Sequence, residues 1–340
     1  MNLLNSVAVL ICLYRFRIYA LNIIESTNCT DYADFIQFQE AYDVSGQIKN
    51  IPVFKYVSSG QSNINGQIEY NCEDVFKYKN EQSCTENPID LETLQTTDSQ
   101  YVQDLSMNGE IRVSSFFFHQ SSCNNPSGQQ YTVWTAEDLN TKAKQPCTCG
   151  QYGNDNCELA FSKYKKHING KKGFVIGSYL NWAEAAALKY GAKRVTTIEY
   201  NRIYSAHKKV VAITPFDYAS QYLNASGSKK KFQADFIISY SSLEHDGLGR
   251  YGDPLNAFGD LLSFAKCNCM LKQGGVLFLG LPIGKDEVQF NAHRIYGYRR
   301  LSILFALGFE ILDIISVTAF TINTYDNGDS TQPVIVLRKK

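Results

Sequence analysis

The chain has 340 residues, of which 44% are hydrophobic and 19% charged, a composition typical of a globular protein with one large domain or two smaller ones. Its 33 Lys and Arg residues balance 33 Asp and Glu residues, so the net charge gives no electrostatic reason to expect a nucleic-acid partner. The one dense basic run, Lys229-Lys230-Lys231, lies beside Gly and Ser and is interpreted as a solvated loop.

The N-terminus has the pattern of a targeting segment. The apolar run Leu3–Tyr14 is too short to cross a bilayer, which takes about 20 residues. It is typical of the hydrophobic part of a signal peptide, and Ala20 is a small residue suited to cleavage. We therefore expect residues 1–20 to be a signal peptide, which places the mature chain in the Golgi lumen or outside the cell, with no stable membrane span. The alternatives are an uncleaved signal anchor extending through Ile24, made costly by two internal arginines, and a cytosolic chain.

Two N-glycosylation tripeptides, at Asn28 and Asn224, and ten cysteines agree with the secretory route. Seven of the cysteines lie in the N-terminal half, from Cys29 to Cys157, and such clustering indicates disulfides formed in an oxidising compartment. Without the leader's cysteine the count is odd, so one thiol would be free or pair between chains. The connectivity stays open.

Residues 21–150 are rich in Asn, Gln, Ser, Thr and Tyr and are broken by turns such as NNPSG. Short apolar runs such as Ile111–Phe118 are candidate strands. We expect an irregular, Cys-rich, disulfide-braced region that leads into the next domain. A zinc site is the rival interpretation, although Cys-x-Cys is poor zinc spacing; its ligands would be Cys147, Cys149 and Cys157.

From about Asn156, predicted strands and helices alternate to the end of the chain. The predicted helices are Cys157–His167, Trp182–Tyr190 (ended by Gly191), Leu255–Met270 and Tyr298–Leu307. The predicted strands are Gly173–Ser178, Val195–Glu199, Val210–Thr214, Ala234–Tyr240, Gly275–Leu281, Phe309–Ile315 and Pro333–Arg338. Because these strands are apolar on both faces, residues 156–340 predict an α/β, Rossmann-like domain with a mostly parallel sheet between two helical layers.

In an open α/β sheet, ligands bind beyond the carboxyl ends of the strands, so the residues that follow each strand are the candidates. Gly177 lets a ligand approach the backbone, and Glu199, 22 positions later, can accept hydrogen bonds from ribose hydroxyls. The competing interpretations are a simple turn for Gly177, a capping or surface acid for Glu199 and a helix cap for Asp217. The candidate cofactor-binding residues are Gly177, Ser178, Glu199, Asp217, Ser241 and Ser242.

The stretch SSLEHDGLGRYGDPLNAFGD, Ser241–Asp260, is a glycine-broken loop at the place where an active site is expected. His245 is the leading candidate for a general base, since an unperturbed imidazole titrates near neutrality, and Glu244 would orient it. Arg250 and Asp253 are candidate substrate-binding residues.

A second cluster lies in FNAHRIYGYRRL, where His293 is the other candidate base and Arg294 a candidate substrate-binding residue. A structural, hydrogen-bonded role beneath a loop is the competing interpretation of both histidines. A Mg²⁺ or Ca²⁺ site is not favoured, and no metal is expected; its ligands would be Glu244, Asp246 and Asp253.

Three blocks, GSYLNWAEAAALKYGAKRVTTIEYN, ISYSSLEHDGLGRYGDPLNAFGD and FNAHRIYG, resemble a nematode-rich family described as Caenorhabditis proteins of unknown function. The resemblance runs from about Lys172 to Ile315. That family is similar in fold to class I S-adenosylmethionine-dependent methyltransferases, and its first loop is likewise poor in glycine. The resemblance implies this fold but no activity. The matching candidates, none with an assigned role, are Gly177, Ser178, Glu199, Ser242, Glu244, His245, Arg250, Asp253 and His293.

The alternation of strands and helices predicted for residues 156–340 fits a dinucleotide-binding enzyme or a class I methyltransferase. The first loop has no G-x-G-x-x-G, the diphosphate cradle of a dinucleotide, which S-adenosylmethionine does not need. We therefore predict an S-adenosylmethionine-dependent O-methyltransferase whose acceptor is a hydroxyl of a glycan or small molecule. The alternatives are a catalytically inactive binding module, with Tyr179 or Trp182 filling the cleft, and an NAD(P)-dependent oxidoreductase.

Overall fold

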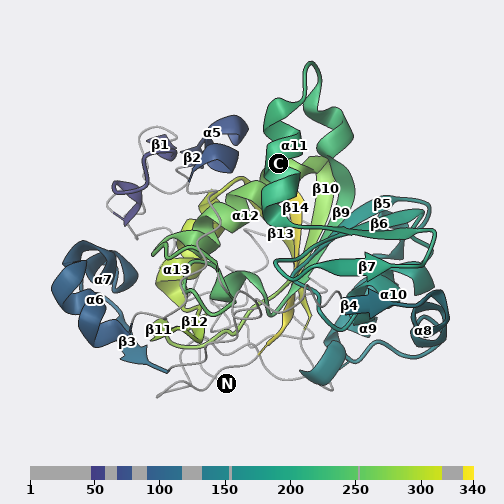
Figure 1. Ribbon diagram of the computed structural model, residues 1–340, viewed down its shortest axis with the longest axis horizontal. Coiled ribbons are helices and arrows are strands. Elements are labelled where there is room, and N and C mark those ends of the chain that lie inside the picture. The colour runs from purple at the N-terminus through teal and green to yellow at the C-terminus, as the bar shows by residue number, and fades with distance from the viewer. Residues whose placement is uncertain are drawn as a thin grey trace, which may run out of the picture.

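The computed structural model describes residues 47–57, 67–78, 90–116, 132–152, 155–251, 253–315 and 332–340. A seven-stranded sheet with helices on both faces forms the centre of these residues (Figure 1). The predicted leader and the tripeptide at Asn28 lie outside the described residues. So do Gly252 of the glycine-broken loop and four cysteines, Cys12, Cys29, Cys84 and Cys123.

The central sheet has the strand order β13-β14-β10-β9-β5-β6-β8. All its strands are parallel except β14, which runs antiparallel to both β10 and β13. Numbered along the chain, the order is 3-2-1-4-5-7-6, and it reverses between β5 and β9. The bounds are Lys172–Ile176 (β5), Arg194–Ile198 (β6), Val210–Ile213 (β8), Ala234–Tyr240 (β9), Leu271–Gly280 (β10), Phe309–Ile315 (β13) and Val334–Lys339 (β14). This confirms the predicted α/β fold of the class I methyltransferase type.

Both faces of the sheet are buried, because successive side chains of a strand point to opposite sides. Phe174 and Ile237 belong to one hydrophobic core with residues of α11, α12 and α13, and Val175 and Ile238 belong to a second core with α9 and α10. In Figure 1, α12 and α13 lie to the left of the strands and α9 and α10 to the lower right. The helices span Asn156–Lys163 (α9), Trp182–Lys189 (α10), Pro215–Asn224 (α11), Gly259–Met270 (α12) and Tyr298–Ala306 (α13).

Two helices depart from the sequence prediction. Helix α12 begins at Gly259 and not at Leu255, because the backbone N–H of Asn256 is bonded to the Gly247 carbonyl and fixes the preceding residues in the loop. Helix α11 is absent from the prediction, although Thr214 caps its first turn and Pro215 occupies its first position. Both residue types are helix-start signals.

The described parts of residues 47–150 are attached to the α/β domain by small sheets. Strand β3 (Arg112–Ser115), within the predicted strand run, pairs in parallel with β11 (Glu287–Phe290), and β11 pairs with β12 (His293–Ile295). Strand β4 (Thr132–Trp134) pairs with β7 (Ile203–Ser205). The remaining elements of this region are β1 (Lys55–Val57), β2 (Gln67–Glu69), α5 (Cys72–Lys77), α6 (Leu91–Thr97), α7 (Ser99–Leu105), α8 (Ala136–Lys142) and the 3₁₀ turn η3 (Gly150–Tyr152).

Two disulfides join described cysteines. Cys72 of α5 is bonded to Cys269 of α12 across 197 residues, and Cys149 is bonded to Cys157. The second bond uses two of the three sulfur atoms that the zinc interpretation requires, so that interpretation is wrong. The other described cysteines, Cys147 and Cys267, are buried free thiols. Disulfides of this kind indicate an oxidising compartment.

None of the helices formed by the described residues combines the length and the apolar character that crossing a membrane requires.

Replacing both Cys72 and Cys269 with Ala should lower the free energy of unfolding by roughly 2–5 kcal/mol, because the bond closes a long loop of the unfolded chain. Replacing Cys149 and Cys157 should cost less, because these residues are only 8 positions apart. Urea denaturation under non-reducing conditions measures both losses. Equal losses for the two pairs would contradict the loop-closure explanation.

Candidate functional site

A cavity of about 610 Å³ lies at the carboxyl ends of β5, β6 and β9, beside the reversal of strand order. An open α/β sheet binds its ligands at this position. The structure brings seven of the twelve predicted site residues together in the cavity lining. They are Gly177, Ser178, Glu199, Ser241, Ser242, His245 and Arg250.

The ends of β5 and β9 approach each other so closely that one position must be glycine. Gly177 has φ +67°, a conformation that L side chains rarely adopt. A Cβ atom added there would lie 1.8 Å from Ser242 Oγ and 2.5 Å from Ser242 Cβ. Gly177 therefore has a steric role in forming the cavity, besides any contact with a ligand.

The loop between β5 and α10, called the first loop, is held by a buried carboxyl group that the sequence does not single out. Ser178 Oγ donates to Glu184 Oε2 over 2.8 Å, and Thr197 Oγ1 donates to Glu184 Oε1 over 2.6 Å. Glu184 is fully buried, and desolvation raises the pKa of its carboxyl to about 7. The alanines around it in WAEAAALKY were the available signal, because they indicate that this side of the helix is buried.

Residues of the N-terminal region make hydrogen bonds to the rest of the first loop. Trp134 Nε1 donates to the Tyr179 carbonyl over 3.3 Å, and Lys142 Nζ donates to the Leu180 carbonyl and to Asn181 Oδ1. The side chains of Tyr179 and Leu180 are 56% and 51% exposed. Tyr179 therefore borders the cavity without filling it.

Glu199 directly follows β6, lines the cavity and is 9% exposed. Its Oε1 accepts two hydrogen bonds from Asn201, one from the backbone N–H and one from Nδ2, both over 3.0 Å. Its Oε2 has no hydrogen bond with a described residue. Burial raises the pKa of this carboxyl, although the bonds from Asn201 act in the opposite direction. The free oxygen can accept a hydrogen bond from a ligand.

Aromatic rings form one wall of the cavity. The ring of Tyr240, at the end of β9, lies 5.3 Å from the ring of Tyr152 and 5.8 Å from that of Trp182, measured between centroids. Gly150 makes room for this cluster, because a Cβ atom there would lie 2.6 Å from Trp182 Nε1. Aromatic faces of this kind attract cationic groups.

Glu244 and His245 form a buried pair in the 3₁₀ turn η6 (Leu243–His245), next to the cavity. His245 Nδ1 lies 2.5 Å from the carbonyl oxygen of Ala292, and because a carbonyl can only accept, Nδ1 carries a proton. Burial lowers the pKa of His245 to about 3, so its imidazole is neutral at physiological pH. Its Nε2 therefore has a lone pair that can accept a proton.

The Glu244 carboxyl faces this nitrogen, with Oε1 3.5 Å from His245 Nε2. Oε1 accepts a hydrogen bond from Ser241 Oγ over 2.7 Å, and Ser241 Oγ accepts one from the Tyr152 hydroxyl. Its Oε2 is buried without a hydrogen bond to a described residue. Desolvation raises the pKa of Glu244 to about 7, so this carboxyl changes charge near neutral pH.

Asp253 and Arg294, both predicted to bind substrate, lie outside the cavity lining and make structural contacts instead. Asp253 accepts hydrogen bonds from the backbone N–H groups of Gly247, Gly249 and Tyr251, which closes the glycine-broken loop. Arg294 is fully buried and donates to backbone carbonyls of the same loop and the segment before α12, those of Glu244, Asp246, Asn256 and Ala257. Sequence cannot distinguish these contacts from ligand binding, because both require polar side chains in a loop.

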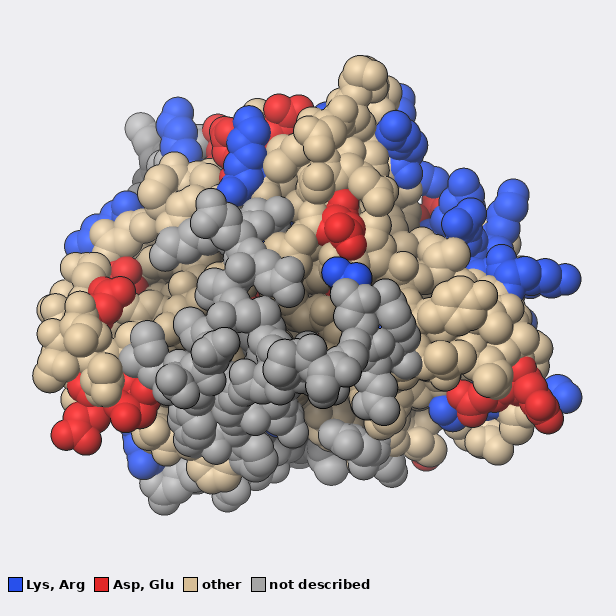
Figure 2. Space-filling view, in the orientation of Figure 1, with Lys and Arg blue, Asp and Glu red and all other residues tan. Residues whose placement is uncertain are grey.

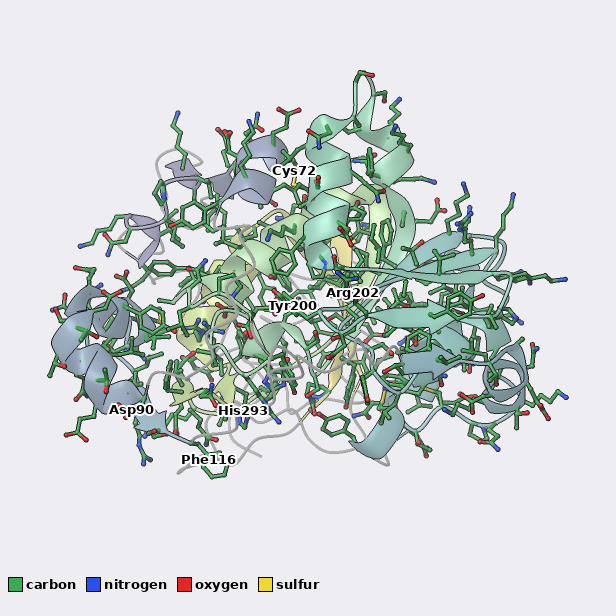
Figure 3. All side chains as sticks on the ribbon, viewed as in Figure 1. Cys72, Asp90, Phe116, Tyr200, Arg202 and His293 are labelled. Carbon is green, nitrogen blue, oxygen red and sulfur yellow. A yellow bond between two sulfur atoms is a disulfide. The ribbon has the colours of Figure 1, made fainter. Side chains whose placement is uncertain are left out.

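Asp217 and His293 also lie outside the lining. Asp217 is exposed in the first turn of α11, where its backbone N–H and its carboxylate are both hydrogen-bonded to Thr214 Oγ1. The helix-cap interpretation accounts for these contacts. His293 lies on β12 with its ring 6.2 Å from that of His245, and Figure 3 shows it apart from the cavity residue Tyr200.

The cavity continues between α11 and α12 to residues that the sequence analysis misses. Lys266 and Met270 line it from α12, and Phe76 lines it from α5, which the Cys72–Cys269 disulfide joins to α12. Lys266 Nζ has no hydrogen bond or ion pair with a described residue. Desolvation lowers the pKa of Lys266, and the charge of Asp246 opposes this effect. No periodic pattern in the N-terminal region indicated that Phe76 would lie here.

The model of a family described as "Caenorhabditis protein of unknown function, DUF268" matches residues 170–339, half of the chain. No curated protein matches the chain.

Several solved structures are similar to 54% of this chain. One is 1,6-didemethyltoxoflavin-N1-methyltransferase from Burkholderia thailandensis, with bound 1,6-didemethyltoxoflavin and S-adenosylhomocysteine (14% identity, 78% of that chain, TM-score 0.38). Another is the N-methyltransferase NodS from Bradyrhizobium japonicum WM9 (14% identity, 96% of that chain, TM-score 0.34). A third is a Lactococcus lactis protein described as a candidate hemolysin (18% identity, 86% of that chain, TM-score 0.35).

Replacing Glu184 with Gln should make the stability of the protein less dependent on pH. Because burial raises the pKa of Glu184 from 4.5 to about 7, the folded state holds this proton more tightly than the unfolded state. Its contribution to stability is therefore fully present below about pH 4.5 and is lost as the pH rises through about 7. Urea unfolding across this pH range measures the difference. Glu137→Gln, on the exposed face of α8, is the control, and an unchanged pH profile in Glu184→Gln would refute the assignment.

Proposed function

Because the chain belongs to this family of Caenorhabditis proteins of unknown function, its activity is inferred from the site, and we propose that it is an S-adenosylmethionine-dependent methyltransferase acting on a hydroxyl group. The observation that carries the proposal is the open cavity at the reversal of strand order, bordered by Gly177, Glu199 and Ser241. A binding module that had lost its ligand would have this space filled by Tyr179 or Trp182.

The residues present fit S-adenosylmethionine. Glu199 offers a carboxylate oxygen at the end of β6, where ribose hydroxyls would be bound. Gly177 makes room for Ser242 at the end of β5, and both residues line the cavity that would receive the ligand. The aromatic wall of Tyr152, Trp182 and Tyr240 suits a sulfonium cation.

The same loop argues against a dinucleotide. In dinucleotide enzymes the diphosphate binds at the N-terminus of the first helix, here α10. Glu184 occupies the first turn of α10, and the cap residue Asn181 donates to the carboxylate of Asp138. Two protein carboxyls therefore lie close to the N-terminus of α10, where they would repel the negative phosphates. This observation disfavours the NAD(P)-dependent oxidoreductase.

His245 is the proposed general base. When bound, S-adenosylmethionine would supply an electrophilic methyl group. The acceptor hydroxyl would transfer its proton to His245 Nε2 as its oxygen bonds the methyl carbon, which yields a methyl ether and S-adenosylhomocysteine. An ionised Glu244, 3.5 Å from Nε2, would stabilise the imidazolium that forms. Arg250, which also lines the cavity, would help to hold the acceptor.

The acceptor that we propose is a glycan hydroxyl. The support is the compartment: two disulfides indicate an oxidising environment, and the N-terminal sequence has the pattern of a signal peptide. Sugars are the abundant hydroxyl acceptors of the Golgi lumen. A signal-anchored form would present the same site to the same lumen, and a small-molecule alcohol is the alternative acceptor.

Calorimetry should detect binding of S-adenosylmethionine to the full chain. Glu199→Ala should weaken binding by roughly tenfold or more, because a charged hydrogen-bond acceptor for the ligand is lost. Asp217→Asn is the matched control, since Asp217 lies outside the cavity lining, and it should bind as the wild type does. Absence of binding to the wild type would overturn the proposal, and binding of NAD in its place would support the oxidoreductase.

Replacing His245 with Asn should lower the rate of methyl transfer by about 10²–10⁴-fold. The readout is transfer of labelled methyl from S-adenosylmethionine to methyl glycosides, and His293→Asn is the control that should keep most of the activity.

In the wild type the rate of methyl transfer should rise with pH through about 7, because the Glu244 carboxyl then ionises beside the imidazole. Glu244→Gln should abolish this rise, and a rise that persists would exclude Glu244 as its source.

A further inference from the structure

Six lysines surround a hollow of about 360 Å³ at the amino ends of the parallel strands. They come from the starts of β5, β6 and β10 and from the 3₁₀ turn η5 (Lys229–Phe232), and all are exposed. Figure 2 shows Lys and Arg side chains gathered on this side, over the ends of β5 and β6 and beside α11. We call this site the basic hollow; its lysines are Lys171, Lys172, Lys193, Lys230, Lys231 and Lys272.

Most of these charges form no ion pair with a described residue. The one acid in the lining, Asp235, pairs with Lys272 over 2.7 Å. Lys231 Nζ lies 5.2 Å from the centre of the Phe232 ring. No hydrogen bond or ion pair joins the Nζ atoms of the other four to a described residue; these are Lys171, Lys172, Lys193 and Lys230.

Lys229, next to Lys230 in the sequence, differs from these four lysines because its ammonium group is hydrogen-bonded to the backbone. Its Nζ donates to the carbonyls of Tyr222 and Ala225 at the C-terminus of α11. The fold therefore accounts for Lys229, but for none of the four unpaired lysines. The sequence interpretation of Lys229-Lys230-Lys231 as a solvated loop cannot show that two of these residues join lysines 37 to 60 positions earlier in the chain.

Gathering like charges around a concavity costs electrostatic free energy and creates a positive potential there. The chain as a whole has no net charge, so this potential is local. A linear polyanion would relieve the repulsion and release the small counterions that the lysines otherwise hold.

The surroundings of the hollow discriminate between polyanions. The exposed large hydrophobic side chains among the described residues, such as Phe116, Leu159 and Tyr204, do not line it. It therefore offers no stacking platform for nucleic-acid bases and no apolar anchor for a membrane. Disulfides indicate an oxidising compartment, where polyanions include sulfated polysaccharides. We propose that the basic hollow binds a sulfated polysaccharide.

This proposal does not depend on methyl transfer. Strand β5 has 5 residues, so its two ends are roughly 16 Å apart, with the basic hollow at one end and the cavity at the other. A polysaccharide in the hollow would hold the protein on a glycan-rich surface and leave the cavity accessible.

The test is calorimetric titration of the full secreted chain with a heparin oligosaccharide and with its desulfated counterpart. The variant replaces the four unpaired lysines, Lys171, Lys172, Lys193 and Lys230, with Gln. The control replaces four exposed lysines elsewhere with Gln and changes the net charge equally; they are Lys49, Lys55, Lys77 and Lys144. Unchanged melting temperatures would establish that both are folded.

We expect the variant to bind heparin at least tenfold more weakly than the wild type, with a smaller dependence on salt, and the control to change less than twofold. The desulfated oligosaccharide should bind at least tenfold more weakly to the wild type. Equal weakening in variant and control, equal binding without sulfate, or no binding at all would overturn the proposal. Equally tight binding of wild type to phosphatidylserine vesicles or to duplex DNA would also overturn it.

Discussion

The parallel pairing of β5 with β9 determines where every part of the site lies. Its register, which places Ile176 opposite Ser239, brings the two following turns into van der Waals contact at Gly177 and Ser242. The strand order reverses between these two strands, so the chain leaves them toward different sides and a cavity opens between the turns. Ser241 adopts φ +52°, a conformation that is uncommon for a residue other than glycine. It is maintained by the bonds that the Ser241 hydroxyl makes with Tyr152 and Glu244.

Buried carboxyl groups give this site its electrostatic character. Desolvation raises the pKa of Glu184, Glu244 and Asp246 to about 7 in each case. The hydrogen bonds that hold the first two carboxyls in place come from hydroxyl groups of Ser178, Thr197 and Ser241. Because a cationic ligand favours the ionised forms, its binding would be coupled to proton release near neutral pH.

The sheet and its ligand-binding edge could be predicted because apolar strands leave a clear pattern, and strand ends then follow from the topology. The contributions of the N-terminal region could not, since Phe76, Trp134 and Tyr152 reach the site through tertiary contacts that no periodicity records. Strands as short as β11 and β12 have too few residues to show alternation. The roles of the polar loop residues were also beyond sequence, because Asp253 contacts backbone N–H groups that would otherwise be open to a ligand.

The disulfide between Cys72 and Cys269 has a consequence for the order of synthesis. At roughly 5–20 residues per second, a ribosome needs about 10–40 s to make the 197 residues between the two cysteines. During that time Cys72 has no partner to pair with, while the nearer cysteine Cys84 is already present. Any earlier bond of Cys72 with another cysteine would have to be exchanged before the pair with Cys269 could form. The disulfide that joins α5, and with it Phe76, to α12 can form only after Cys269 has been made, nearly four fifths of the way along the chain.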